Sequence, residues 1–235
     1  MRPLKDSDDP CDFLRDADPD RPCVVAQLGQ SLDGRIATPT GESRWINGGA
    51  ALDHVHRIRA NVDAVVVGVG TVTADNPLLT VRRVAGNSPA RVVIDPSGRL
   101  PADARILTDD GVRRIVVHAT DAGSAPEGVE VVALTRHGPA LPPHAIVNAL
   151  FKRGLRRILV EGGAWTVSQF LNADAVDRLH IMVAPLLIGS GKPGLSLRPI
   201  ARLTEARRPE TRIFPLPDGD VLFDCNLRAI KEQTS

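Results

Sequence analysis

Short apolar runs rich in β-branched residues recur along the chain, and each run is bounded by turn residues. This pattern is typical of strands in a sheet that is buried on both faces. It predicts strands at 24–28, 63–68, 91–94, 114–118, 129–133 and 157–160. Apolar positions with a helical period lie between some of these strands and predict helices at 49–61, 142–153 and 164–172.

The alternation of strands and helices predicts an α/β fold, a three-layer αβα sandwich around a mostly parallel sheet. Segments 178–184 and 220–227 also have the character of strands, but no long helix separates them. They predict an antiparallel pair at one edge. The sequence has no repeat and no long linker, so residues 23–235 are predicted to form a single domain behind a flexible, Asp-rich tail at 1–22.

Composition and charge narrow the classes of function. The chain has 235 residues, 43% of them hydrophobic, and a formal net charge of +1. That balance does not favour a nucleic-acid or membrane surface, and no apolar run reaches the roughly 18 residues that a membrane-spanning helix needs. Cys11, Cys23 and Cys225 are far apart and lack metal-binding spacing, which favours a reducing cytoplasm and predicts no bound metal.

The stretch VEGGAWTVSQFL, residues 160–171, joins a predicted strand to a predicted helix. Adjacent glycines at a helix start leave its unpaired N–H groups open to a phosphate, and ligands of α/β sheets bind beyond strand ends. The alternative is a tight turn that needs positive φ. A buried, unpaired carboxylate is costly, so we expect a polar ligand to compensate Glu161.

Three further polar loops, 30–37, 40–46 and 71–82, follow or precede apolar segments. Each alone is typical of an ordinary turn, and an aspartate or an Asn-Pro pair caps two of them. Together with Arg59 they suit a phosphorylated small molecule, because arginine and hydroxyl donors are the usual partners of phosphate oxygens.

Other apparent motifs are weaker evidence of function. Thr73 stands where a dinucleotide fingerprint needs its third glycine, and proline follows Lys192 where a P-loop needs Ser or Thr. His54 and His56 are two apart on a predicted helix and therefore point to different faces. Solvated helix histidines are favoured there over a zinc site.

Several motifs occur in an order and spacing that resemble one known family. They are SLDG followed by RIA, GES-x-WI, HRIRANVDAVVVGVGTVTADNPLLTVR, VVIDPSGRLP, LVEGG and APLLIGSG, between about residues 24 and 227. The chain resembles the pyrimidine reductase of riboflavin biosynthesis, which also occurs fused behind a deaminase domain. The resemblance implies a dihydrofolate-reductase-like fold and hydride transfer from NADPH to C1′ of a ribosylaminopyrimidine 5′-phosphate, giving a ribitylamino product.

The resemblance also implies binding roles for individual residues. Arg59 and Arg82 would suit the 5′-phosphate, and Glu161 would hydrogen-bond the pyrimidine. The substrate would contact Ser43, Arg59, the backbone of Leu79, Arg82 and Glu161. The cofactor would contact Gly29, Trp45, Thr71, Asp75, Gly162, Gly163, Ala164, Trp165, Thr166, Val167 and Ser168.

Catalytic roles would fall to Glu161 and to Asp33, which would orient the sugar or relay a proton. Ser97 or Arg99 would meet the 2′-phosphate of the cofactor. Many fused members carry a lysine two residues before the position of Gly29, whereas this chain has Gln27. The source of the proton is therefore open. The zinc signature of the deaminase, H-x-E followed by P-C-x-x-C, does not occur in the sequence, so we expect reduction without deamination.

Several alternatives stay open. The substrate is either the diaminopyrimidinone or its deaminated uracil form. A reductase of the same fold acting on a dihydropterin or folate-like ring is one rival, and a catalytically silent nucleotide-binding protein, supported by Gln27, is another. Relatives are commonly homodimers, and the apolar segment 181–188 would pair across such an interface.

Overall fold

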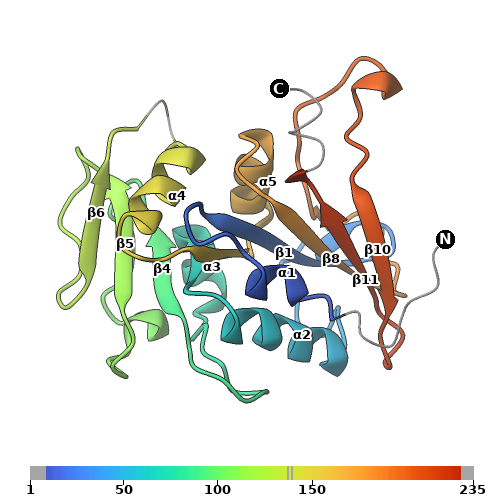
Figure 1. The fold of residues 1–235 in the computed structure, drawn as a ribbon, viewed down its shortest axis with the longest axis horizontal. Coiled ribbons are helices and arrows are strands. Elements are labelled where there is room, and N and C mark those ends of the chain that lie inside the picture. Colours follow the sequence, from blue (N-terminus) through green and yellow to red (C-terminus); the bar gives the residue numbers. More distant parts are fainter. Residues whose placement is uncertain (1–8, 137, 139, 229–235) are drawn as a thin grey trace.

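A nine-stranded sheet forms the centre of the computed structural model, which describes residues 9–136, 138 and 140–228 (Figure 1). From one edge to the other the strands are β10 (Glu210–Pro215), β11 (Val221–Asn226), β8 (Arg178–Ala184), β1 (Cys23–Ser31), β7 (Arg157–Glu161), β3 (Ala64–Gly68), β4 (Ala90–Ile94), β5 (Arg114–Ala119) and β6 (Glu130–Leu134). Strands β8 to β6 in this order run parallel, and the β10–β11 hairpin is antiparallel to β8. The predicted mixed sheet with an antiparallel edge is confirmed.

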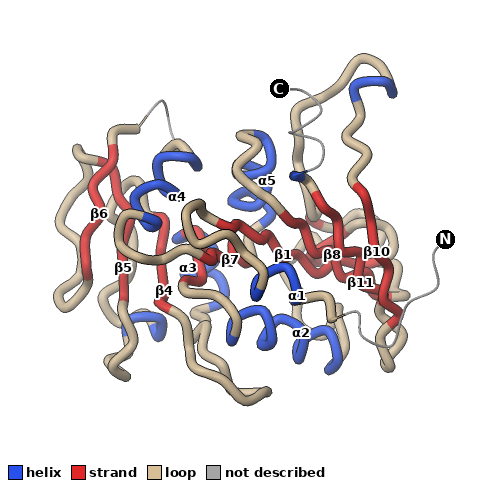
Figure 2. Tube along the Cα trace, viewed as in Figure 1, coloured by secondary structure: helices blue, strands red, loops and turns tan. Residues whose placement is uncertain are grey.

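Helices cover both faces of this sheet (Figures 1 and 2). One face carries α1 (Asp12–Arg15), α2 (Gly49–Ala60) and α3 (Val69–Asp75), and the other carries α4 (Pro143–Phe151) and α5 (Ala164–Asn172). Short 3-10 turns lie at Arg105–Leu107 and Leu203–Glu205.

Side chains of successive strand residues point to opposite faces, so the central strands supply two cores. On β1, Val24 and Ala26 pack in the core beneath α5, whereas Cys23 and Val25 pack in the core beneath α1. All four are at most 2% exposed. This two-sided burial explains the nearly unbroken apolar runs in the sequence, and the predicted three-layer αβα architecture is confirmed.

Several elements of the structure were not predicted from the sequence pattern. The predicted strands and the three predicted helices are present, and their ends agree within two residues, except that β1 continues to Ser31, three residues beyond its predicted end. The elements α1, α3 and β10 were not predicted, nor were β2 (Arg35–Ala37) and β9 (Lys192–Pro193). The last two pair with each other in a separate two-stranded sheet. α3 has only seven residues and is followed by Asn76 in the left-handed conformation. A helix of this length is too short to show a helical period in the sequence.

Part of the segment predicted to be a flexible tail is packed. Cys11 and Leu14 are 2% and 1% exposed and belong to the core that also contains Val25 and Ile58. The prediction is therefore wrong for the segment around α1, because apolar side chains in an otherwise Asp-rich segment dock this helix on the core. Residues 18–21 are exposed. Residues 1–8 lie outside the described residues.

The late apolar segment 181–188 does not offer a free strand edge. β8 hydrogen-bonds to β1 on one side and to β11 on the other, and it ends at Ala184. Its backbone therefore has no pairing capacity left for a second subunit, and the expected route to a dimer through this strand is wrong. Within the described ranges, the longest helices are also too short and too polar to cross a bilayer.

Candidate functional site

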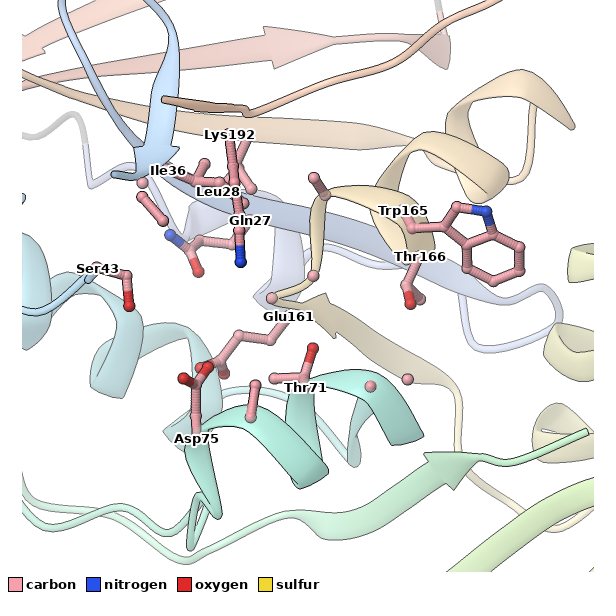
Figure 3. A pocket seen from close by; sticks show the side chains of 18 of the residues that line it. Gln27, Leu28, Ile36, Ser43, Thr71, Asp75, Glu161, Trp165, Thr166 and Lys192 are labelled. Carbon is pink, nitrogen blue, oxygen red and sulfur yellow. The ribbon is translucent and has the colours of Figure 1, made fainter. Parts of the chain in front are cut away.

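A cavity of about 1190 Å³ opens at the carboxyl ends of β1, β7 and β3 (Figure 3). Its walls come from the β3–α3 and β7–α5 turns, α2, the loop at 41–47, and the small β2–β9 sheet. Single small-molecule sites span about 300–1,000 Å³, so this volume has room for a cofactor and a substrate together. The position agrees with the general rule that open α/β sheets bind ligands beyond strand carboxyl ends.

The two glycines that follow Glu161 have both properties that the sequence left as alternatives. Gly162 and Gly163 have φ of 69° and 68°, and a Cβ on Gly163 would lie 2.7 Å from Thr71 Oγ1. The turn therefore requires glycine. It also faces the cavity, and no side chain of the described residues caps the first turn of α5, so its N–H groups are available to a ligand.

Glu161 is paired within the protein. Arg59 Nε donates to Glu161 Oε2 at 2.8 Å, Nη2 donates to the other carboxylate oxygen, and Nη1 donates to the carbonyl of Thr80 at 3.1 Å. The side chains of Arg59 and Glu161 are 8% and 13% exposed. The expectation that a ligand must compensate this carboxylate is wrong, because Arg59 from α2 compensates it. It follows that most N–H donors of Arg59 are already engaged.

The two histidines of α2 are buried, in contrast to the solvated histidines predicted. His54 is 1% exposed and its Nε2 lies 3.0 Å from His180 Nδ1, whereas His56 is 3% exposed and accepts a hydrogen bond from Arg82 N at 3.1 Å. Burial, followed by the charges of Arg59 and Arg82, lowers the pKa of His56 to about 4. His56 is therefore a neutral acceptor that fixes the backbone beside the cavity.

Asp33 lies outside the cavity wall. Its carboxylate accepts hydrogen bonds from Ser31 Oγ at 2.6 Å, Gly189 N at 2.6 Å and Ile188 N at 3.1 Å. These three bonds lower its pKa to about 2. The prediction that Asp33 relays a proton conflicts with this geometry, because the carboxylate does not line the cavity and instead anchors the loop between β8 and β9.

Most of the other predicted contacts do line the cavity. They are Gly29, Ser43, Trp45, Thr71, Asp75, Arg82, Ser97, Arg99, Gly162, Gly163, Ala164, Trp165 and Thr166. Trp45 is 84% exposed with a φ of 71°, so it stands at the mouth in a strained conformation.

Three predicted contacts do not line it. Leu79 is 3% exposed in the hydrophobic core with a φ of 55°. Val167 and Ser168 are 0% and 1% exposed, and Ser168 Oγ accepts a hydrogen bond from Ser196 N. On a helix, successive residues point in different directions, so the run 162–168 divides between cavity and core after Thr166.

Sequence reasoning missed four polar residues of the wall, namely Arg44, Asn47, Lys192 and Ser196. Asn47 is placed by long-range contacts, since its amide donates to Asp220 Oδ2 at 3.1 Å. Lys192 is placed by the pairing of β9 with β2. Neither contact has a local signal in the sequence, although Gly191 and Gly194 near Lys192 are the residue type that a close approach of two backbones requires.

Residues 22–210 match the family model described as the RibD C-terminal domain. The chain belongs to this family. One similar protein is the 2,5-diamino-6-ribosylamino-4(3H)-pyrimidinone 5′-phosphate reductase of Methanothermobacter thermautotrophicus. It is 37% identical over 180 residues, which cover 72% of this chain and 80% of that protein. The riboflavin biosynthesis protein RibD of Aquifex aeolicus is 32% identical over 77% of this chain and 51% of its own length.

Solved structures of RibD proteins are also similar. Acinetobacter baumannii RibD aligns with a TM-score of 0.75 and 30% identity over 91% of this chain and 60% of that one. A deaminase and 5-amino-6-(5-phosphoribosylamino)uracil reductase from Thermotoga maritima aligns with a TM-score of 0.73 and 29% identity over 88% and 57%. The chain thus spans most of the archaeal reductase but only about half of the longer RibD proteins.

Proposed function

We propose that this chain reduces C1′ of a ribosylaminopyrimidine 5′-phosphate with NADPH, giving the ribitylamino product. The observation that carries the proposal is the pairing of two unlike ends in one cavity. One end is the uncapped, glycine-lined start of α5, and the other holds the Glu161–Arg59 pair together with Ser43 and Arg82. The names of the archaeal and RibD relatives support the same chemistry.

The glycine-lined end fits a dinucleotide cofactor. A Cβ on Gly68 would lie 2.5 Å from Thr166 Oγ1 and a Cβ on Gly163 would meet Thr71, so this corner admits only backbone. The first turn of α5 would hold the diphosphate with its N–H groups, while Ser97 and Arg99 beyond β4 would hold a 2′-phosphate. When bound, the reduced nicotinamide supplies the hydride.

The other end fits the pyrimidine nucleotide. Glu161 keeps lone pairs for the amino and ring N–H groups of a pyrimidine, because each carboxylate oxygen accepts only one hydrogen bond from Arg59. Arg82, whose guanidinium has no ion pair with a described residue, is the better candidate for the 5′-phosphate. Arg59 then acts mainly by fixing the orientation of Glu161.

The direct test is NADPH oxidation by the purified chain with each candidate substrate, the diaminopyrimidinone and the deaminated uracil form. We expect turnover with at least one of them and a lower kcat/KM with NADH. Dihydrofolate serves as the comparison substrate, and a higher kcat/KM for dihydrofolate would overturn the proposal.

The proposal extends to a cytoplasmic homodimer. Cys11, Cys23 and Cys225 are free and buried, as suits a reducing compartment. Light scattering coupled to gel filtration measures the oligomeric state, and a monomeric mass at micromolar concentration would contradict the dimer.

A further inference from the structure

Lys192 is an unassigned cation of the cavity. It lies on β9, in the mouth of the pocket, and its side chain makes no hydrogen bond or ion pair with any described residue. Figure 3 shows the side chain extending into the cavity, so that its ammonium end lies between Ser43 and Thr166 and above Glu161. That is the zone where the predicted substrate and cofactor ends of the cavity meet.

The backbone around Lys192 is built to hold it there. Ala37 of β2 pairs with Lys192, and a Cβ on the preceding Gly191 would collide with the Ala37 carbonyl. A Cβ on Gly194, two residues further, would lie 2.6 Å from Gln30 Oε1. Both glycines therefore permit the close approach of β9 to β1 and β2.

The loop that leads to β9 is anchored as well. Asp33 accepts the N–H groups of Ile188 and Gly189, and Arg35 Nε donates to the Gly189 carbonyl at 2.8 Å. Asp33 thus acts on Lys192 through the backbone. It is a positioning residue, which accounts for a carboxylate close to the site that does not face it.

Reduction at C1′ of a ribosylamine needs a proton as well as a hydride, because the ring oxygen O4′ leaves C1′ and ends as a hydroxyl. Among the described residues that line the cavity, few side chains can donate a proton to O4′. Glu161 and Asp75 are carboxylates, which accept at neutral pH. His56 is neutral with its pKa lowered to about 4, and Gln27 is an amide. Arginines do not release protons in proteins.

We propose that the Lys192 ammonium is the acid of this reaction. The C1′–O4′ bond breaks, its electron pair passes to O4′, and O4′ takes a proton from Lys192. Hydride is added to C1′, so the step consumes one hydride and one proton in all. Lys192 is exposed at the mouth, and its neutral amine regains a proton from solvent. This inference rests on the proposed function.

The test compares Lys192→Arg and Lys192→Gln with the parent enzyme. Arginine keeps the positive charge but cannot deliver the proton, so in Lys192→Arg we expect kcat to fall about 10²- to 10⁴-fold, the usual contribution of general acid catalysis. The Kd of the pyrimidine phosphate, measured by calorimetry without cofactor, should change less than about threefold, as should KM. Lys192→Gln should lose as much kcat and also bind the anionic substrate more weakly.

The matched control is Lys152→Arg at the exposed end of α4, which should match the parent in every measurement. Added methylammonium should partly restore kcat in Lys192→Ala and leave Lys192→Arg unchanged. Full kcat in Lys192→Arg would overturn the proton role, as would a raised Kd with normal kcat, which would mark Lys192 as a binding charge only. An inactive parent enzyme would instead overturn the proposed function itself, and the proton role with it.

Discussion

The two walls of the cavity are built in different ways. The wall at β3–α3 and β7–α5 consists of two strand-to-helix turns, in which Gly68, Gly163, Thr71 and Thr166 interlock within a few residues of their strands. The opposite wall is the β2–β9 sheet. It is anchored by the hydrogen bond from Gly189 N to Asp33, two residues that are 156 positions apart in the sequence. Both walls bring together residues that are far apart in the sequence, but the first is built on strands of the central sheet, whereas the second is a separate two-stranded sheet anchored by polar bonds to Asp33.

This difference assigns different tasks to the two walls. A backbone-lined corner at a helix start suits the diphosphate of a cofactor, which backbone N–H groups bind. A small sheet held by a few polar bonds suits the reacting side, where Lys192 must meet substrate and then solvent. Substitutions in the first wall should therefore act on cofactor affinity, and substitutions in the second should act on kcat.

The largest effect on cofactor binding is expected from Gly163→Ala. A residue with Cβ at a φ of 68° costs about 1–2 kcal/mol, and contact with Thr71 Oγ1 at 2.7 Å adds an overpacking cost of about 1–3 kcal/mol. Relief of this strain displaces the start of α5, so NADPH affinity should fall about a hundredfold. Fluorescence titration of NADPH measures it.

Gly123→Ala is the control for that substitution, because nothing lies within 4 Å of a Cβ there and its φ is not positive. Unchanged NADPH affinity in Gly163→Ala would show that the diphosphate binds elsewhere.

Glu161→Gln should mainly affect the substrate. A hydrogen bond to a charged group contributes about 1.5–3 kcal/mol, so kcat/KM for the pyrimidine phosphate should fall about 10- to 100-fold while the Kd of NADPH changes less than about twofold. Steady-state kinetics and NADPH titration separate the two. Glu130→Gln is the matched control, because Glu130 is also paired with arginines but lies on β6 at the far edge. Equal losses of substrate and cofactor binding would show that Glu161 does not divide them.

Asp33→Asn should have a smaller effect, confined to the wall that contains Lys192. Asparagine replaces one carboxylate oxygen by an amide nitrogen that cannot accept, so Ile188 N or Gly189 N loses its partner and the loop before Lys192 loosens. We expect kcat to fall about tenfold, since displacements near 1 Å can cost up to about a hundredfold. Hydrogen exchange should rise in residues 185–191. A much larger loss of kcat without faster exchange would return Asp33 to the chemistry.

The smallest effect concerns stability rather than activity. Burial, followed by the charges of His180 and Arg57, lowers the pKa of His54 from 6.5 to about 3. Below pH 6.5 the unfolded chain takes up a proton that the folded chain refuses, so this contribution to stability is present above pH 6.5 and is lost as pH falls toward 3.

One such proton gives a slope of at most about 1.4 kcal/mol per pH unit. Urea unfolding at pH 7, 6 and 5 should therefore show a flatter decline in His54→Gln than in the parent protein. Parallel curves would mean that His54 takes up its proton in the folded state as well.

Local pattern determined much of the molecule. The apolar runs and helical periods are sufficient for the three-layer sandwich, because burial on both faces leaves a direct mark on the composition of each strand. The glycine-lined turn after β7 could also be predicted from the sequence, because the strand, the glycines and the helix follow one another directly. The short segments α1, α3, β2 and β9 left no such mark, because a helix of less than two turns or a strand of three residues or fewer shows no period.

The tertiary structure decided what charged side chains do. Glu161 was expected to need a ligand, but Arg59 lies 102 positions earlier and reaches it only through the packing of α2 on the sheet. Asp33 was expected in the chemistry, but its partners at 188 and 189 come from another strand connection. Charge partners depend on distance in space rather than along the chain, so the sequence alone determined which residues gather near the strand ends, and only the fold determined which of them face the cavity.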